Sequence, residues 1–483
     1  MLKFVLLALF VVGCNSNNMI KVALKPQSST DTLDTTKIRY TNEFHILENL
    51  TTRLVSLDSN GNYQLELASS IDKISDNQVL IGIKKAYFSD GTIISLSDVN
   101  LSLNRSLQGT SHVQLSNYIE NISIFHDKIK FVFKKPCKSF FYYLSLPDFG
   151  ILHPSQYSKS STLASDYKIS SGPFYLSSDS SKMIKNKFYT LSPSNYPDEV
   201  ILVNPLGQNT FDGLISQKVD VGQLSLHDFL KDYQKITQLK EYRLLGSPSD
   251  ALTYILFNPN SKNQLKPLHK KWLQQQIFKH FTIPDDLSVI SKKAQQYFPE
   301  ESRAFISHNS LLETLGMDLV SKPEDFPNKI VIHTFTTAYK VTPEPLVRLI
   351  EKIEDLNIQI INDVKPENFH RMYKDGEIDY FLNIMSTDYR MPEEAINFEF
   401  FSDDSLMEDY SGKIRKLYDE YQATSDPKKE VEVLQEISRS MSKSGNFIPL
   451  YHATTPYFYN TTTIDLNGLS HLFVTNFWKM KSL

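Results

Sequence analysis

Short apolar segments with the periodicity of strands alternate with helical segments along almost the whole chain. This alternation is typical of α/β folds and disfavours an all-helical or an all-β arrangement. The chain has 483 residues, of which 41% are hydrophobic and 22% are charged. Because this length exceeds what one hydrophobic core accommodates, we expect an α/β protein divided into two or three lobes.

Two segments in the first third of the chain are predicted strands, residues 78–84 and 128–134. The second alternates apolar and polar residues strictly, so one buried face should carry Ile129, Phe131 and Phe133. Between these strands, Ser95 and Asp98 have the spacing of a capping box, which predicts the start of a helix. The buried face of this helix should carry Val99, Leu103 and Leu107.

A second helix is predicted after Asp426 and Pro427, which suit the N-cap and the first helical position. It should end near Gly445, and its apolar side carries Leu434, Ile437 and Met441. Two further segments, starting near residues 211 and 369, share a helix-to-strand pattern in which an acidic residue, Asp220 or Asp379, precedes an apolar strand. Two lobes built on similar crossings would explain this likeness, and chance similarity of two αβ units is the alternative.

The N-terminal segment has the features of an export signal. Lys3 precedes an apolar run at residues 4–12, which is about half the roughly 20 residues that a membrane-spanning helix needs. Residues 1–13 are therefore predicted to be a signal peptide. Gly13 and Cys14 resemble the lipobox of bacterial lipoproteins, in which the Cys thiol is acylated and becomes the mature N-terminus. We expect Cys14 to carry a lipid anchor, with ordinary cleaved secretion as the alternative.

Composition excludes two classes of function. The 51 basic and 55 acidic residues give a formal net charge of -4, and no long run of Lys or Arg is present, so nucleic acid is not an expected partner. If Cys14 is acylated, Cys137 is the remaining cysteine. The mature chain then has no internal disulfide and no residues for a zinc-thiolate or redox site.

The usual sequence signals of catalysis are absent as well. The 16 glycines never fall closer than six residues apart, which rules out the Gly-rich dinucleotide motif and the hydrolase nucleophile elbow. The 12 histidines show none of the short spacings of a metal site. We therefore expect no cofactor, no bound metal and no enzymatic activity, although a triad assembled from distant residues would leave no such signal.

Six segments resemble, in the right order, the signatures of family 5 extracellular solute-binding proteins, the oligopeptide-, dipeptide- and nickel-binding subunits of ABC importers. Three lie in the first half of the chain, NLTTRLVSLDSNGNYQLELA at 49–68, FSDGTIISLSDV at 88–99 and SGPFYL at 171–176. Three lie in the second half, YILFNPN at 254–260, GEIDYFLNIMSTDYRMPEEAINFEFF at 376–401 and FIPLYHATTPYF at 447–458.

This resemblance implies a type II periplasmic-binding-protein fold, in which two lobes close on a ligand about a hinge, together with an additional domain. By analogy, lobe I would be discontinuous and take residues 14–43, 155–255 and 447–483. The additional domain would span residues 44–154, and lobe II would span residues 256–446.

The resemblance also implies ligand-binding residues. In the peptide-binding members, an Asp at the position of Asp388 pairs with the α-ammonium group of the peptide, and a carboxylate in a closing cleft suits that role. The alternative is that Asp388 only starts a loop ahead of Pro392. Met385 stands where the family usually has Trp, so the pocket wall and the ligand class stay open.

Three more residues are candidates for ligand contact. By resemblance, Ser171 and Phe174 lie in a turn that runs into lobe I, although the intervening Gly172 has a structural role as its alternative. Tyr389 and Phe174 would supply aromatic surface to side-chain pockets, with burial in the core as the alternative. His452, near the expected hinge, is interpreted as a structural residue.

The sequence thus predicts a non-enzymatic, monomeric receptor that is anchored outside the cytoplasmic membrane by the lipid on Cys14. Its partners would be a peptide or a similar small solute and the permease of an ABC importer. Two alternatives remain. One is a sensor that uses the same binding fold without transport, and the other is an exported hydrolase.

Overall fold

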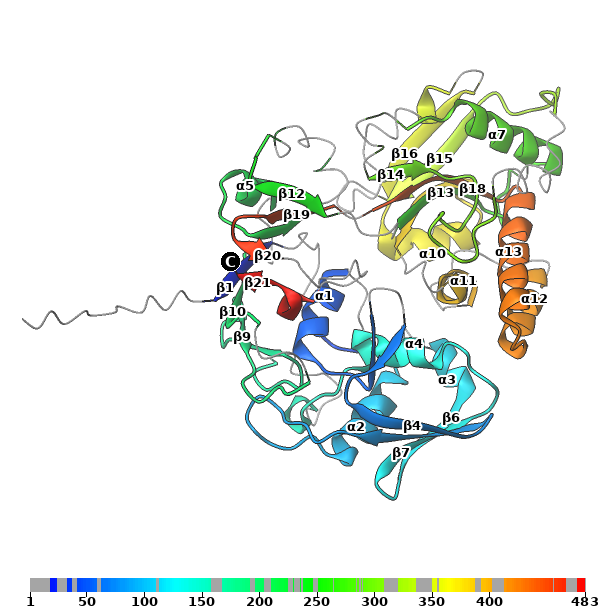
Figure 1. Ribbon diagram of the computed structural model, residues 1–483. Coiled ribbons are helices and arrows are strands. Elements are labelled where there is room, and N and C mark those ends of the chain that lie inside the picture. Colours follow the sequence, from blue (N-terminus) through cyan, green and yellow to red (C-terminus); the bar gives the residue numbers. More distant parts are fainter. Residues whose placement is uncertain are drawn as a thin grey trace, which may run out of the picture.

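The α/β class expected from the sequence is confirmed by a computed structural model. The structure describes residues 18–23, 33–36, 41–58, 62–109, 113–157, 167–191, 196–203, 210–224, 229, 235, 238–245, 251–263, 265–283, 285, 288, 290–307, 320–335, 350–353, 356–386, 392–401, 412–454, 456–465 and 476–482. Three parts are arranged around the centre of the molecule, each built on its own sheet (Figure 1). Within the described ranges, no helix combines the length and apolar character of a membrane span.

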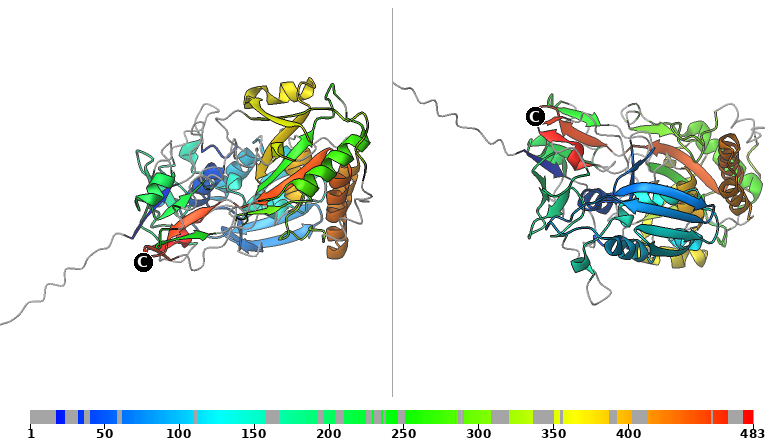
Figure 2. Two further views of the ribbon diagram at one scale, coloured as in Figure 1. Left: turned by 90° about the horizontal axis from the view of Figure 1, so that it is seen from above. Right: turned by 60° about the horizontal axis from the view of Figure 1, so that its bottom comes forward.

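Lobe I is built on a seven-stranded sheet with the order β12-β19-β11-β1-β10-β9-β8. Its strands are β1 (Met19–Ala23), β8 (Phe174–Leu176), β9 (Lys182–Lys185), β10 (Glu199–Leu202), β11 (Val221–Gln223), β12 (Tyr242–Leu245) and β19 (Tyr457–Asn460). Helix α5 (Thr210–Ile215) belongs to this lobe, and helix α1 (Thr41–Leu50) packs into its core through Leu47 and Leu50. The short strands β20 (Ile464–Asp465) and β21 (Lys481–Ser482) and the 3-10 helix Phe477–Lys479 lie near β1, as all three views show (Figures 1 and 2).

The additional domain contains a four-stranded antiparallel sheet with the order β4-β5-β7-β6. These strands are β4 (Ala68–Ser75), β5 (Gln78–Ile83), β6 (Ile119–Phe125) and β7 (Lys128–Phe133), and the hairpin β2 (Val55–Leu57) and β3 (Tyr63–Leu65) precedes them. The helices are α2 (Leu96–Ser106), α3 (Val113–Tyr118) and α4 (Phe140–Ser145), followed by the 3-10 helices Pro147–Phe149 and Pro154–Gln156.

The local predictions for this domain are confirmed except at Leu107. On β7, the residues predicted to be buried are 0%, 0% and 6% exposed, namely Ile129, Phe131 and Phe133. Ser95 is the N-cap of α2, and its side chain and that of Asp98 make both hydrogen bonds of the capping box. Val99 and Leu103 are fully buried, whereas Leu107 is the C-cap of α2 and only half-buried because the helix ends before it.

Lobe II is built on a six-stranded sheet with the order β14-β18-β13-β17-β15-β16. Its strands are β13 (Ala251–Phe257), β14 (Ser291–Lys293), β15 (Ile330–Phe335), β16 (Ile358–Val364), β17 (Tyr380–Ser386) and β18 (Phe447–Ala453). Its helices are α7 (Pro267–His280), α10 (Pro366–Lys374), α11 (Pro392–Phe401), α12 (Lys413–Ala423) and α13 (Pro427–Lys443). One core cluster packs α7 against the sheet, and the other packs α10 to α13 against it.

Helix α13 forms as the sequence predicts. Asp426 is its N-cap and accepts a hydrogen bond from the backbone of Lys428, and Pro427 is its first residue. The three residues predicted for its apolar side are at most 4% exposed, namely Leu434, Ile437 and Met441. Gly445 follows with a φ of +66°, a conformation that glycine adopts without strain.

Two antiparallel strand pairs connect the lobes. In lobe I, β12 pairs with β19, and in lobe II the strands that come next to them in sequence, β13 and β18, pair with each other. The chain therefore passes between the two sheets twice, once between Leu245 and Ala251 and once between Ala453 and Tyr457, and Ala251 and Ala453 are paired with each other. Such a double crossing, in which a few residues join two separate sheets, is the geometry of a hinge.

The sheet boundaries differ from the expected lobe boundaries by one strand at each crossing. We expected lobe I to include residues up to 255 and from 447 onward. Strands β13 and β18 instead lie inside the sheet of lobe II, because every residue of both strands is buried and β13 has ladder partners on both sides. A fully buried strand of this kind is an interior strand of a sheet.

The two helix-to-strand segments identified in the sequence form equivalent units. Helix α5 leads to β11, which is parallel to β1, and α10 leads to β17, which is parallel to β15. The acidic residue before each strand fixes its start. Asp220 Oδ2 accepts a hydrogen bond of 2.7 Å from the backbone of Lys21, and Asp379 Oδ2 accepts one of 3.1 Å from Asn263. The lobes therefore do share one type of crossing.

Candidate binding site

The segment with the predicted ammonium-binding residue leaves the sheet of lobe II at the hinge. Ser386, the last residue of β17, pairs with Ala251, which in turn pairs with Ala453. Both of these partners adjoin the crossings between the lobes. Asp388 and Tyr389 lie outside the described residues, so the fold fixes only the strand end from which their segment departs.

Met385 is the last residue before this strand end whose side chain is described. It is 4% exposed and belongs to the core cluster of lobe II. The Tyr297 hydroxyl lies 3.8 Å from its sulfur and also donates a hydrogen bond of 3.0 Å to the carbonyl of Ala395 on α11. Met385 therefore packs beneath α11, and contact between Met385 and a ligand stays a prediction.

Phe174 and Ser171 lie in the interior where lobe I meets the additional domain. Phe174 is fully buried and packs edge-on against Tyr196, with ring centroids 5.5 Å apart. The Ser171 hydroxyl accepts a hydrogen bond of 3.0 Å from the backbone of Thr52 and donates one of 2.5 Å to the carbonyl of Ile151. These contacts give both residues structural roles, and ligand contact by either one stays a prediction.

At the same junction, Gly172 lets its own backbone lie directly against the backbone of Leu50. Its N–H donates a hydrogen bond of 3.0 Å to the carbonyl of Leu50. A Cβ at this position would lie 2.5 Å from the backbone carbon of Leu50, which is far inside normal contact distance. This turn therefore requires glycine, as the structural alternative for this segment anticipated.

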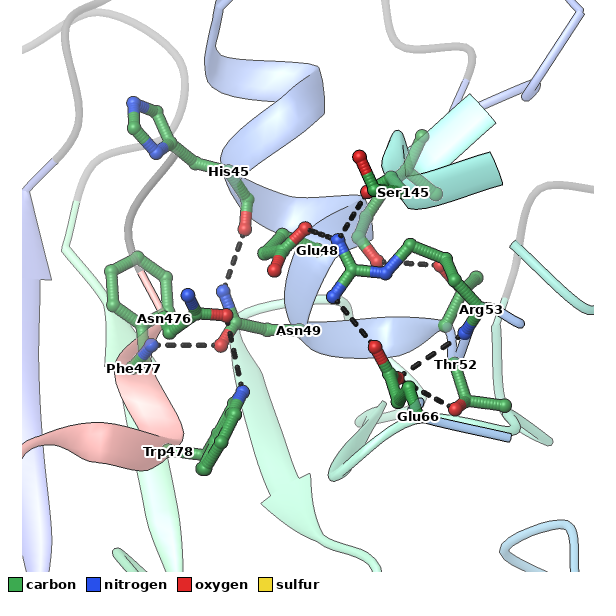
Figure 3. A network of polar contacts seen from close by, with 12 residues as sticks. His45, Glu48, Asn49, Thr52, Arg53, Glu66, Ser145, Asn476, Phe477 and Trp478 are labelled. Atoms are coloured by element: carbon green, nitrogen blue, oxygen red, sulfur yellow. Dashed lines mark hydrogen bonds and ion pairs between the residues drawn. The ribbon is translucent and has the colours of Figure 1, made fainter. Parts of the chain in front are cut away.

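A buried ionic network ties α1 to the additional domain (Figure 3). Arg53 forms an ion pair with Glu48 and another of 3.1 Å with Glu66, and its guanidinium also donates to the carbonyl of Ser145 at 3.0 Å. All three charged side chains are at most 11% exposed. Burial raises the pKa of Glu48 above its usual range, and the positive charge of Arg53 opposes that shift. Sequence reasoning missed this network, although Arg53 and Glu66 lie in the first segment that resembles family 5.

A separate set of contacts joins α1 to the C-terminal segment through Asn49 (Figure 3). Its side chain donates to the carbonyl of His45 at 2.7 Å and accepts a hydrogen bond of 2.8 Å from the backbone of Phe477. His45 Nε2 lies 2.5 Å from the hydroxyl of Tyr457, and burial lowers the pKa of His45 to about 3. His45 is therefore neutral at physiological pH, and this chain of contacts fixes α1 to β19 rather than exposing a reactive group.

Helix α11, which follows the Asp388 segment, is fixed by two buried carboxyl groups. Glu393 forms an ion pair of 2.8 Å with Arg303. Glu399 accepts a hydrogen bond of 3.3 Å from Tyr254, whose hydroxyl accepts one of 3.1 Å from Asn383. Burial raises the pKa of Glu399 to about 8, so this carboxyl is protonated at neutral pH.

A cavity of about 290 Å³ lies beside the edge strand β14 of lobe II. His452, predicted to be structural, borders it, is 5% exposed and lies 3.3 Å from the carbonyl of Gln296. Burial lowers the pKa of His452 to about 4, so its ring is neutral. At the rim, Lys292 pairs with Glu300 at 3.3 Å and with Glu301 at 3.2 Å, which leaves no excess of one charge for an ionic ligand.

Among the residues with described placement, no three His, Cys, Asp or Glu side chains are grouped so that they could hold a metal ion.

The family resemblance found in the sequence is confirmed by comparison with known proteins. Residues 62–279 match the family model described as bacterial extracellular solute-binding proteins, family 5 Middle. No curated protein matches the chain.

Solved structures are similar over nearly the whole chain. AgaA from A. tumefaciens R10, in complex with agropinic acid, is 19% identical with a TM-score of 0.73, and the match covers 96% of this chain and 99% of that chain. NikA from Brucella suis, in complex with Fe(III)-EDTA, is 14% identical with a TM-score of 0.77, covering 96% and 100%. DppA from Helicobacter pylori, in complex with the peptide STSA, is 16% identical with a TM-score of 0.70, covering 96% and 98%. The chain has the type II periplasmic-binding-protein fold that these solved structures share.

Proposed function

From this confirmed resemblance to family 5 solute-binding proteins, we propose that the chain captures peptides or similar small solutes outside the cytoplasmic membrane and delivers them to an ABC importer. It acts as a monomeric, non-enzymatic receptor. The observation that carries the proposal is the double passage of the chain between the sheets of lobes I and II, from Leu245 to Ala251 and from Ala453 to Tyr457, because it lets two rigid sheets close on a solute.

Asp388 binds the α-ammonium group of the solute in this proposal. Support comes from the end of β17 at Ser386, next to the hinge residues Ala251 and Ala453, two residues before Asp388. Two residues of extended chain span at most about 7 Å, so the segment begins beside the crossings. A carboxylate that loses its water when the lobes close holds a cation by a charge-assisted hydrogen bond. Met385, Tyr389, Phe174 and Ser171 complete the proposed ligand contacts.

Substitution of Asp388 tests this proposal. Asp388→Ala should weaken binding of free-amino peptides by about 30-fold to several thousand-fold, which corresponds to about 2–5 kcal/mol for truncating one member of a buried charge pair. N-acetylated peptides should bind the variant and the parent almost equally. Asp375→Ala, which removes an exposed carboxylate from the same lobe, is the matched control. A loss below about threefold in Asp388→Ala would show that Asp388 is not the ammonium partner.

Lipid anchoring is the second part of the proposal. The signal-like segment 1–13 and the Gly13-Cys14 pair support acylation of Cys14 in the exported protein. Cys14→Ser should release the mature protein from membranes into the soluble extracytoplasmic fraction. Continued membrane association of this variant would contradict the anchor, and would leave the proposal for solute capture unaffected.

The Asp388→Ala test also distinguishes between the possible classes of ligand. The solved relatives carry an agropinic acid, an iron chelate or a peptide in their complexes, so a chelate or an opine is the competing cargo for this chain. Asp388→Ala should leave the affinity for a solute without an ammonium group unchanged. A sensor whose closed form binds another protein instead of a permease would give the same binding result. Transport assays in a strain lacking the protein distinguish the sensor from the transport receptor.

A further inference from the structure

The additional domain touches lobe II directly through Lys138. Its ammonium group forms an ion pair with Glu430 on α13 and lies 5.0 Å from the ring centroid of Tyr421 on α12. Its backbone N–H donates a hydrogen bond of 3.1 Å to the side-chain carbonyl of Gln422. Lys138 and Glu430 are 22% and 16% exposed, so water screens this pair only partly.

A second contact joins the same two parts. The side-chain amide of Asn397 on α11 donates a hydrogen bond of 2.6 Å to the hydroxyl of Tyr143 on α4. Asn397 and Tyr143 are 6% and 4% exposed, so this bond is buried at the junction. Figure 1 shows α4 beneath α11, with α12 and α13 to its side.

Arg303 organises the lobe II side of this junction. Its guanidinium lies 2.8 Å from Glu393 on α11 and 3.7 Å from Glu430 on α13, and it donates to the hydroxyl of Tyr421 at 3.1 Å. One cation thus connects the three helices that face the additional domain. Helix α11 is also the helix that begins four residues after Asp388.

We propose that this junction is a latch, in which Lys138 and Tyr143 hold lobe II closed against the additional domain. They are positioning residues, because they contact α11 to α13 and not the solute. The latch rests on the proposed function, since it matters only if lobe II moves. It adds that the additional domain controls how long a captured solute is retained.

The chemistry of the junction suits a contact that opens and closes. Its described contacts are an ion pair, two hydrogen bonds and a cation–π contact, which water replaces at small cost when the parts separate. The junction between lobe I and the additional domain is different. There the ion pairs of Arg53 with Glu48 and Glu66 are buried. Separating these residues would leave buried charges without partners, so this junction is not expected to open.

Crosslinking between the two parts tests the latch without any ligand. In a Cys14→Ser background, Ala423→Cys places an exposed thiol next to Gln422, whose side chain bonds the backbone of Lys138, the residue after the natural Cys137. A short bifunctional maleimide should join the two thiols at a rate that follows the closed population. Tyr143→Phe combined with Glu430→Gln should slow crosslinking and speed release of a bound fluorescent tripeptide, by about 5- to 30-fold for the loss of two polar contacts.

Two controls keep the result specific. Lys413→Ala removes an ion pair of 2.8 Å with Glu436 that lies within lobe II, and it should leave the crosslinking rate unchanged. Tyr143→Phe alone removes one hydroxyl. It should retain the melting temperature of the lobes and slow crosslinking less than the double variant does. A crosslinking rate in the double variant equal to that of the parent overturns the latch. If crosslinking slows but Asp388→Ala leaves peptide affinity unchanged, the latch stands and the ammonium role of Asp388 falls.

Discussion

The hydroxyl of Tyr254 donates a hydrogen bond of 3.3 Å to Glu399, and both side chains are buried in the core of lobe II at 0% and 4% exposure. Tyr254 lies on the interior strand β13, which adjoins the hinge, and Glu399 lies on α11, which follows the Asp388 segment. This contact therefore connects the hinge strand to the helix that follows the proposed ligand segment, and it depends on the protonation state of one carboxyl group.

Stability should fall as the pH rises because of Glu399. Its pKa is about 8 in the folded protein and close to its usual value of 4.5 in the unfolded chain. Between these values the folded state holds a proton that the unfolded state has released, so each pH step upward favours unfolding. The melting temperature of Glu399→Gln should match that of the parent near pH 4.5 and exceed it toward pH 8. Melting temperatures of both proteins across this window measure the effect, and parallel curves would contradict the buried neutral carboxyl.

Arg53 should be among the most sensitive positions for stability. Arg53→Met leaves Glu48 and Glu66 buried without their cation, which should cost about 3–5 kcal/mol of unfolding free energy. Lys73→Met removes an ion pair whose members are 67% and 81% exposed, and it should cost at most about 1 kcal/mol. Urea unfolding of the two variants and the parent gives the comparison. Equal losses in both would mean that the Arg53 network is solvated.

Gly172 should not tolerate even one added methyl group. Gly172→Ala places a Cβ 2.5 Å from the backbone of Leu50, and the backbone shift needed to relieve this contact should cost roughly 1–3 kcal/mol. Gly213→Ala is the matched control, because it lies in α5 and its Cβ would be 3.3 Å from Cγ1 of Val219, a close contact that a shift of a few tenths of an ångström relieves. In a helix, Ala in place of Gly stabilises by about 0.5–1 kcal/mol. Melting temperatures should therefore move in opposite directions, and a neutral Gly172→Ala would contradict the close packing of this junction.

Local patterns in the sequence predicted local elements well. The capping box of Ser95 and Asp98, the alternation of β7 and the Asp426-Pro427 start of α13 all depend on residues within one or two turns or strands. Leu107 was predicted one position too far, because apolar spacing does not mark where a helix ends. The α/β class and the likeness of the two helix-to-strand segments could also be predicted, because their patterns lie within single segments of the sequence.

Contacts between distant segments were beyond prediction. Lys138 and Glu430 are 292 residues apart, and their charges look like ordinary solvated residues until the fold brings them together. Arg53 and Glu66 lay within a recognised segment, but nothing local showed that both would be buried. Whether residues 251–255 and 447–453 join the sheet of lobe I or that of lobe II could likewise not be told locally, because sheet membership is decided by the partners on either side.

The most direct test of solute capture is native mass spectrometry of the mature protein purified without its acyl chain, since binding sites of closing proteins retain cargo through purification. We predict bound masses that form a ladder of short peptides, and the ladder would also give the range of peptide lengths. A bare protein that gains no thermal stability from a mixed peptide library would contradict peptide capture.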